Sequence, residues 1–363
     1  MSSTLPRSPA RRCRTRRRSP RSSSPPRPSS PTSPRRTPRR CPVAEWKTSD
    51  LTIEVVSSMN TNVGPGETRG PVTSGVQRVA LVSCDEARDI DYDMQSVRQA
   101  LIDIGVDAVV VSWDDATVDW SSFDRAILRS TWDYHRRLEE FLVWARATNE
   151  VTRLCNSLAV IEWNTDKHYL AELCDAGFAT VPTTFIEVGG DARSEIERVL
   201  SFGDAVVKPC VSAGSNDTER HTTAESALAQ IADLHARGRA VMVQPYMAQV
   251  DADDETGLVY MNGVFSHAFA KGPLLANAKN MEGGLYAEER IEARVADAAQ
   301  RALGDASIAW VSRRFGTPLY ARVDLLPTIN GPVIIELEMT EPSLYVALGD
   351  GAPERFARAV LDC

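Results

Sequence analysis

The sequence predicts an α/β protein built from strand–helix–strand units over residues 76–363. Short apolar runs bounded by turn residues recur along this region, and most are followed by segments whose apolar residues recur every three or four positions. The first pattern is typical of buried strands and the second of amphipathic helices. Strands that alternate with helices favour a parallel sheet. A hydrophobic content of 43% supplies enough apolar surface for a sizeable core.

The first lobe is expected over residues 76–160. Met94, Val97, Leu101 and Ile104 lie on one face of a helix that follows its first strand. The predicted strands cover 78–84, 107–113 and 125–131, and a second helix lies around 141–145.

A second, larger domain is expected over residues 161–363, in two parts. The first part is a lid over about 180–250, preceded by a helix at 166–176. Its predicted strands are 183–188, 205–211 and 240–247, and its helices are 191–202 and 224–236. The second part, about 251–363, begins with a hairpin because Asn262-Gly263 separates two strand-like runs. It continues with a helix at 287–303, strands at 319–326 and 332–339, and a helix from about 353.

Residues 1–75 are predicted to be a disordered extension. Residues 1–42 consist mostly of Arg, Pro and Ser and carry +13, so the remaining residues carry −21 of the chain's net −8. Such a composition cannot bury enough apolar surface to offset chain entropy. A basic arm that binds nucleic acid without specificity is one interpretation. A transit peptide is another, although the prolines oppose an amphipathic helix. We favour a start assigned too far upstream, with Met59 as the true start.

Charge, apolar runs and cysteines narrow the class of protein. The acidic region after the extension argues against a folded core that binds nucleic acid. No apolar run is long enough to span a membrane, and no signal peptide precedes the fold. The seven cysteines are scattered without metal-ligand spacing, so reduced thiols and a cytoplasmic location are expected.

Several polar residues follow strands of the lid in a pattern typical of nucleotide binding. Lys208 ends an apolar strand and could hold a phosphate; a lysine that snorkels to the surface is the alternative. The small-residue loop that follows could place backbone N–H groups over phosphates, or be an ordinary turn. Its candidate residues are Ser212, Ala213, Gly214 and Ser215. The hinge after the next strand, with Gln244, Tyr246 and Met247, could offer backbone groups to an adenine edge or simply connect two strands.

The last two strands carry the strongest constellation of charged residues. Arg322 and Asp324 lie two apart on one strand, and Glu336 and Glu338 lie two apart on the next, so each pair shares a face. Buried and unpaired, such groups would be costly. Carboxylate oxygens that converge from two strands suit Mg²⁺. An exposed, salt-bridged sheet face is the alternative.

The order of these residues resembles the ATP-grasp superfamily. The resemblance runs from WNTDKHYLAEL through VVKPCVSAGS and QPYM to RVDLL and IELEMTEPS, and covers residues 76–363. It implies a fold in which two α+β lobes clasp ATP, and ATP with Mg²⁺ (Mn²⁺ as an alternative ion) as cofactors. Lys167, Lys208 and Lys271 would contact phosphates, and Glu255 the ribose. Arg322 would face an acyl phosphate, and Asp324, Glu336 and Glu338 would hold the metal. Many members have Asn at the last ligand position, where this chain has Glu338.

Three stretches, two of which overlap those above, resemble a narrower group. This group comprises the cyclo-ligases that act on O-ureido-serine in D-cycloserine biosynthesis, and their relatives. They are RSTWDYHRRLEEF, WNTDK and ELEMTEPSLY. The resemblance implies an ATP-dependent ligase that forms C–N bonds from a small carboxylate through an acyl phosphate. Arg129, Trp132 and Asp133 follow a first-lobe strand, where ligands bind in α/β sheets, so they are substrate-side candidates; structural packing is the alternative. An intermolecular amide or peptide ligase, or a nucleotide-binding protein without turnover, remains open.

The connection at Asn330-Gly331 sets a condition on the metal site. A two-residue turn there would pair Ile329 with Pro332. In that register Asp324 faces away from Glu336 and Glu338, because side chains alternate along a strand. A shared metal therefore requires an odd-length loop or a bulge. Pro327, which cannot donate to a regular ladder, is compatible with such an irregularity.

We predict that deletion of residues 1–58 leaves the melting temperature and ATP turnover unchanged, because these residues are not expected to contribute to the fold. Thermal unfolding and an ATPase assay on the full and truncated chains measure both quantities. A clear loss of either would contradict the prediction. Native peptides that map upstream of Met59 would contradict the mis-assigned start.

Overall fold

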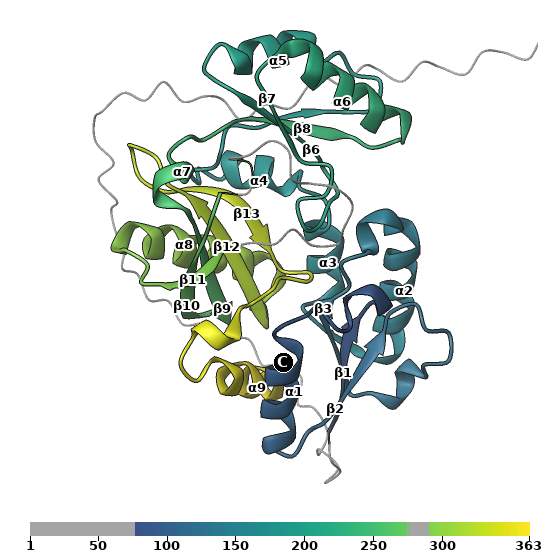
Figure 1. Ribbon diagram of the computed structural model, residues 1–363. Coiled ribbons are helices and arrows are strands. Elements are labelled where there is room, and N and C mark those ends of the chain that lie inside the picture. Colours follow the sequence, from purple (N-terminus) through teal and green to yellow (C-terminus); the bar gives the residue numbers. More distant parts are fainter. Residues whose placement is uncertain (1–76, 274, 276–289) are drawn as a thin grey trace, which may run out of the picture. The chain divides into compact units, whose positions relative to one another are not determined.

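The computed structural model describes residues 77–273, 275 and 290–363, all of which belong to the structural unit Pro38–Cys363. The predicted extension over residues 1–75 lies outside the described residues. Three sheets follow one another along the chain, in the order parallel, antiparallel, antiparallel (Figure 1). The predicted α/β class, with a parallel first lobe and two α+β parts after it, is confirmed.

The first sheet is parallel, with strand order β2-β1-β3-β4. Its strands are β1 (Arg78–Ser83), β2 (Asp107–Ser112), β3 (Arg125–Ser130) and β4 (Arg153–Cys155), with helices α1 (Met94–Asp103) and α2 (Leu138–Val151). The apolar face predicted for α1 is buried at Met94, Val97 and Leu101, whereas Ile104 falls just beyond the helix and is exposed. Helix α2 buries Phe141 and Ala145 against the aromatic cluster around Trp113.

The second sheet lies in the segment predicted to be the lid and is antiparallel, with strand order β5-β8-β6-β7. Its strands are β5 (Thr184–Ile186), β6 (Ala205–Pro209), β7 (Glu219–His221) and β8 (Val241–Pro245), with helices α5 (Arg193–Leu200) and α6 (Ala224–Ala236). The two helices contact each other and the sheet (Figure 1). They bury Ile196, Val199, Ile231 and Leu234, which recur at helical spacing.

The third sheet is antiparallel and carries the remaining strands in the order β11-β10-β9-β12-β13. They are β9 (Glu255–Met261), β10 (Val264–Lys271), β11 (Ile291–Arg294), β12 (Tyr320–Leu326) and β13 (Val333–Glu338). The helices outside the lid and first lobe are α3 (Leu158–Asn164), α4 (Tyr169–Asp175), α7 (Val250–Asp253), α8 (Ala298–Phe315) and α9 (Ala352–Asp362). The predicted hairpin at Asn262-Gly263 is confirmed, and both residues have the positive φ that a two-residue turn favours.

The helix predicted at 287–303 is misplaced. Strand β11 pairs with β10 over Ile291–Arg294, and helix α8 begins only after Asp297. The local signal for that start is a capping box, in which Asp297 and Gln300 each accept the other's backbone N–H. Apolar spacing alone extended the helix too far toward the N-terminus, because it could not reveal that β10 supplies a pairing edge for residues 291–294.

The expectation that all cysteines are reduced is wrong for two of them. Cys155, at the end of β4, forms a disulfide with Cys363, which follows α9. The two residues are 208 positions apart, so their spacing gave no indication of the bond. Among the described residues Cys84, Cys174 and Cys210 are free thiols. None of the described helices is long and apolar enough to cross a membrane.

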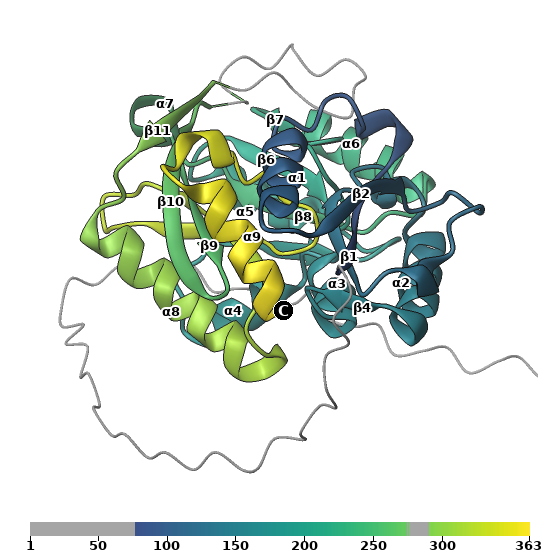
Figure 2. The ribbon, with the colours of Figure 1, turned by 90° about the horizontal axis from the view of Figure 1, so that it is seen from below.

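Buried polar groups join the first lobe to the third sheet. Asn156, after β4, donates to the carbonyls of Tyr320 and Met339 and accepts from the N–H of Leu319. Helix α9 packs on α1, as Figures 1 and 2 both show. The first lobe is thereby held against the strands that carry the charged residues.

Asp93 makes a second buried contact between the first lobe and the segment that follows β13. Its buried carboxylate accepts three backbone N–H bonds, from Leu344, Tyr345 and Val346, at 2.6–2.9 Å. It also pairs with Arg129, whose side chain is 0% exposed. Converging N–H groups and a guanidinium stabilise a carboxylate away from water. Asp93 therefore fixes the backbone of residues 344–346 against the first lobe.

We predict that Asp93→Asn destabilises the protein by about 3–5 kcal/mol, because it leaves the buried Arg129 guanidinium without its counter-ion. The free energy of unfolding, from denaturant titration, measures the loss. Asp89→Asn is the matched control, since Asp89 is exposed in the same loop. Equal stability of the two variants would contradict a structural role for Asp93.

Candidate active site

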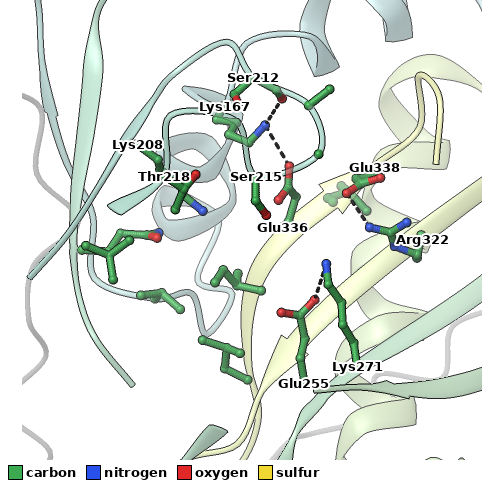
Figure 3. A pocket seen from close by; sticks show the side chains of 18 of the residues that line it. Lys167, Lys208, Ser212, Ser215, Thr218, Glu255, Lys271, Arg322, Glu336 and Glu338 are labelled. Carbon is green, nitrogen blue, oxygen red and sulfur yellow. Dashed lines mark hydrogen bonds and ion pairs between the residues drawn. The ribbon is translucent and has the colours of Figure 1, made fainter. Parts of the chain in front are cut away.

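A cavity opens between the lid strands and the third sheet, and most of the residues singled out in the sequence line it. Lys167, Lys208 and Lys271 all reach it, as do Arg322 and the glutamates of β13 (Figure 3). The remaining predicted residues on its wall are Trp132, Ser212, Ala213, Gly214, Ser215, Gln244, Tyr246, Met247, Glu255, Glu336 and Glu338. Asp324, Arg129 and Asp133 do not line it.

Lysine is rare in this chain and is concentrated at the cavity. Only five of the chain's 41 basic residues are lysines, and arginine supplies the rest. The three lysines in the described part of the chain all line this cavity. A lysine ammonium is a compact point charge, whereas a guanidinium is a planar fork. The cavity thus gathers compact cations, which suit phosphate oxygens.

Lys167 lies between the lid and the third sheet. Its ammonium is 2.9 Å from the Glu336 carboxylate and donates to the Ser212 carbonyl at 2.7 Å (Figure 3). Burial alone would lower the pKa of Lys167, but the Glu336 carboxylate raises it above its ordinary value. Burial likewise opposes the ionisation of Glu336, yet Lys167 and then Lys208 hold the pKa of Glu336 down at about 2. Both groups are therefore charged at neutral pH.

Lys208, on β6, is a buried ammonium with no hydrogen bond or ion pair to the described residues. Burial lowers its pKa, since the charged form is separated from water. An anion placed in the cavity would restore a partner for this charge. Lys208 is therefore the residue best prepared to bind a phosphate group.

The loop after β6 contains several residues in a left-handed backbone conformation. Gly214, Ser215 and Asp217 all adopt positive φ angles of 57–58°. For the two non-glycine residues this conformation costs roughly 1–2 kcal/mol each. Such strain is often kept where it aims backbone N–H groups at a ligand. Ser212 and Ser215 lie beside the lysines in the cavity (Figure 3).

The hinge after β8 borders an apolar slot. Tyr246 and Met247 pack beside a cluster of Val181, Val250, Leu326 and Val333, with Ile335 at its edge. Gln244 uses its buried side chain to donate to the Thr183 hydroxyl, so it holds β8 to the start of β5. A flat apolar slot with backbone groups at its rim can take a nucleobase. Across the cavity Glu255 and Lys271 face each other on paired strands, 3.7 Å apart.

The bulge required by the metal hypothesis is present. Asp324 pairs with Glu336 and Arg322 with Glu338, but Leu325 pairs with Ile334, so β13 contains one extra residue at Ile335. The connection is also longer than two residues, because Leu326 pairs with Val333. The extra residue turns the strand over, which brings Arg322, Asp324 and the two glutamates to the same face.

Arg322 neutralises two of these carboxylates. Its guanidinium makes a two-pronged contact with Asp324, at 2.8 Å on each prong, and reaches Glu338 at 2.5 Å. Asp324 lies beneath it, away from the cavity wall. Burial first, and then Glu336 and Asp324, raise the pKa of Glu338 to about 8 despite Arg322. This end of the cavity therefore holds more carboxylates than its cations can satisfy.

The ligand oxygens of Asp324, Glu336 and Glu338 do not all lie within 4.8 Å of one another. Among the described residues, the group of potential metal ligands that does is Asp166, His168 and Cys210. In that group the His168 ring donates through Nδ1 to the Asp166 carboxylate at 2.6 Å. The three predicted ligands thus lie on the same face of the sheet, and their oxygens contact the side chains of Arg322 and Lys167.

Glu341 and Tyr134 were not singled out in the sequence, yet both line the cavity. Burial, and then Glu338, raise the pKa of Glu341 to about 8, and a hydrogen bond from Tyr134 opposes the rise. The available signal was the position of Glu341 three residues after Glu338, next to Pro342 in ELEMTEPS. Without the turn that follows β13, that spacing could not show where its side chain points.

Of the three substrate-side candidates in the first lobe, one lines the cavity and two do not. Trp132 lines the cavity, and its indole N–H donates to the backbone carbonyl of Glu341 at 3.0 Å. Asp133 accepts from the Trp113 indole and pairs with Arg137, at 2.8 Å and 2.5 Å. Arg129 is the buried partner of Asp93. The structure therefore places Arg129 and Asp133 behind the cavity wall.

A lid and an antiparallel sheet that enclose lysines, an apolar slot and clustered carboxylates define an ATP-grasp ligase. The D-cycloserine synthetase DcsG N-terminal domain family matches residues 79–156. The cycloserine biosynthesis protein DcsG of Streptomyces lavendulae is 36% identical over 297 residues, which cover 78% of this chain and 98% of that protein. The chain belongs to the D-cycloserine synthetase family of ATP-dependent, C–N bond-forming ligases.

Solved structures agree with this assignment. The crystal structure of D-cycloserine synthetase DcsG superposes with a TM-score of 0.73 at 35% identity, over 78% of this chain and 99% of that one. The ATP-grasp ligase PsnB, solved with a precursor variant, Mg and ADP, gives 0.54 at 16% identity, over 78% and 97% of the two chains. At that identity the second likeness shows the fold alone.

We predict that Lys208→Met lowers ATP turnover by about two to three orders of magnitude, as loss of one well-placed charge donor does elsewhere. The melting temperature without nucleotide should stay the same or rise, since methionine fills similar space without burying a charge. Steady-state kinetics and thermal unfolding measure the two effects. Arg193→Met on exposed α5 is the control, and full activity of Lys208→Met would refute the role.

Proposed function

We propose that the enzyme activates a small amino-acid-like carboxylate as an acyl phosphate, which an amine then attacks. The observation that carries the proposal is the buried Lys208 ammonium, unpaired among the described residues, in a cavity that also holds Arg322 and the β13 carboxylates. In the first step a substrate carboxylate oxygen attacks the γ-phosphorus of ATP, and the bond to ADP breaks. In the second step the amine forms the C–N bond, phosphate leaves, and the nitrogen loses a proton.

The residues divide this work by position. Lys167, Lys208 and Lys271, with the backbone of residues 212–215, bind and orient the phosphates. Tyr246, Met247 and Gln244 bound the adenine slot, and Glu255 faces the ribose. Arg322 would face the charge that develops on the acyl phosphate, because its guanidinium lines the cavity beside Glu338. Positioning and charge stabilisation supply most of the rate enhancement in phosphoryl transfer.

The donor set also fits a divalent ion. Asp324, Glu336 and Glu338 offer hard oxygen ligands, and burial, followed by Glu336 and Asp324, raises the pKa of Glu338, which a bound cation would lower. These three residues would hold Mg²⁺, or Mn²⁺ in its place, if Arg322 and Lys167 turn toward the phosphates. When bound, the ion would neutralise charge on the phosphate oxygens. A ligase that consumes ATP is expected in the cytoplasm, the compartment that supplies it.

The lid and the first lobe exclude water from the intermediate. The Lys167 contact to the Ser212 carbonyl joins the phosphate loop of the lid to the helix before it. Trp132 and Tyr134 close the opposite wall. An enclosed acyl phosphate reacts with the amine rather than with water. The similarity to D-cycloserine synthetase favours an amine on the same molecule, as in O-ureido-serine; an amide ligase that joins two substrates is the second candidate.

We predict that O-ureido-serine alone supports release of ADP and phosphate, because a cyclising ligase needs no second amine. A heavy-oxygen label in its carboxylate should appear in the released phosphate, since the acyl phosphate passes one carboxylate oxygen to phosphorus. Mass spectrometry of the phosphate and of the product checks both points. Release of AMP and diphosphate would contradict the mechanism, and a requirement for a second amine would favour the two-substrate ligase.

A further inference from the structure

The charged side chains of the cavity pair with one another, with two exceptions. Lys167 pairs with Glu336, and Lys271 with Glu255. Arg322 serves both Asp324 and Glu338. Among the described residues, the ionisable groups on the wall without an ion pair are the Lys208 amine and the Glu341 carboxyl group. The first has a ready partner in the phosphates of ATP, whereas the second needs a cation.

Glu341 belongs to a different part of the cavity from Lys208. Lys208 projects from lid strand β6, but Glu341 follows β13, where the chain returns to the first lobe. Trp132 and Tyr134 from the first lobe, and Ser343 and Tyr345 from the same segment as Glu341, also line the cavity. The carbonyl of Ser343 accepts from Arg322 at 3.0 Å, so this subsite borders the guanidinium assigned to the acyl phosphate.

The backbone that carries Glu341 is fixed on both sides. The Trp132 indole N–H donates to the Glu341 carbonyl at 3.0 Å, and the Tyr320 hydroxyl donates to the Thr340 carbonyl at 2.9 Å. Asp93 accepts from the N–H groups of Leu344 and Tyr345. A carboxylate on so constrained a backbone is preorganised to hold a ligand group in one orientation.

The surroundings select a compact cation. Tyr134 hydrogen-bonds the Glu341 carboxyl group, the Trp132 indole bonds to the backbone of the same residue, and aromatic faces attract ammonium groups. A metal ion would instead require several converging ligands, and among the described residues Glu341 belongs to no group of three potential metal ligands. An alkylammonium donates to the carboxylate and lies against the rings.

We infer that Glu341 binds the ammonium group of an amino-acid substrate and thereby directs that substrate's carboxylate toward Arg322. The inference rests on the proposed function and narrows it: the substrate is an amino acid with a free amino group that does not react. Glu341 is then a specificity residue, and carboxylic acids without the ammonium are poor substrates.

The test compares Glu341→Gln with the wild-type enzyme on two ligands, O-ureido-serine and its analogue without the amino group. Glutamine keeps the size and removes the charge. We expect the KM for O-ureido-serine to rise about ten- to hundredfold, as for a lost charge-assisted hydrogen bond, with the KM for ATP unchanged. The wild type should prefer the amino acid over its analogue by a similar factor, and Glu341→Gln should lose that preference. Glu354→Gln, at an exposed position of α9, should retain it.

Calorimetric titration of both ligands, with a non-hydrolysable ATP analogue present, gives the same comparison without turnover. Thermal unfolding identifies a variant that does not fold, and Glu341→Asp, which keeps the charge, should then recover part of the preference. A fall in kcat with unchanged KM, or an unchanged preference in Glu341→Gln, would overturn the inference alone. A wild-type enzyme that neither binds nor consumes O-ureido-serine or other amino acids would remove the proposed substrate class as well.

Discussion

The bulge at Ile335 is the constraint on which the active site depends. Without that extra residue, a regular ladder would place Asp324 on the face opposite Glu336 and Glu338, and Arg322 would lose its contact with Glu338. With it, one guanidinium and three carboxylates share a face at the wall of the cavity. The bulge also brings Ile335 to the apolar slot beside Tyr246 and Met247. One irregularity in a strand therefore supplies both the charged floor of the cavity and the edge of the apolar slot.

The electrostatics of the cavity follow from how these charges are separated from water. A buried charge is tolerated when it is paired, and Arg322, Lys167 and Lys271 each have a carboxylate within 4 Å. The pairing leaves Lys208 on the lid and Glu341 near the first lobe. Burial lowers the pKa of Lys208 and raises the pKa of Glu341, so it favours the neutral form of each group. Ligands that bring opposite charges to these two points would recover that cost. The cavity is thus polarised from strand β6 to the segment that follows β13.

The first lobe contributes by holding the cavity wall at Glu341 in place. Trp132 bonds to the backbone at Glu341, and Asp93 gathers the N–H groups of the segment that follows. Asn156 and the Cys155–Cys363 disulfide fasten the end of β4 to the third sheet and to the C-terminus. These contacts are buried and polar, so they are specific as well as stabilising. Arg129 acts within this scaffold, as the partner of Asp93 behind the wall.

Local pattern in the sequence determined the class of fold and most of the strands and helices, and together with the family resemblance it singled out most of the residues that line the cavity. Periodicity identifies long amphipathic elements, and Lys208, Gln244 and Glu255 lie at strand ends that the pattern marks. It could not identify β4 and β7, which are three residues long and exist only because a neighbour pairs with them. Nor could it locate the start of α8, the bulge at Ile335, the disulfide or the direction of Glu341. Each of these depends on contacts between residues far apart in the chain, and only the tertiary structure brings such residues together.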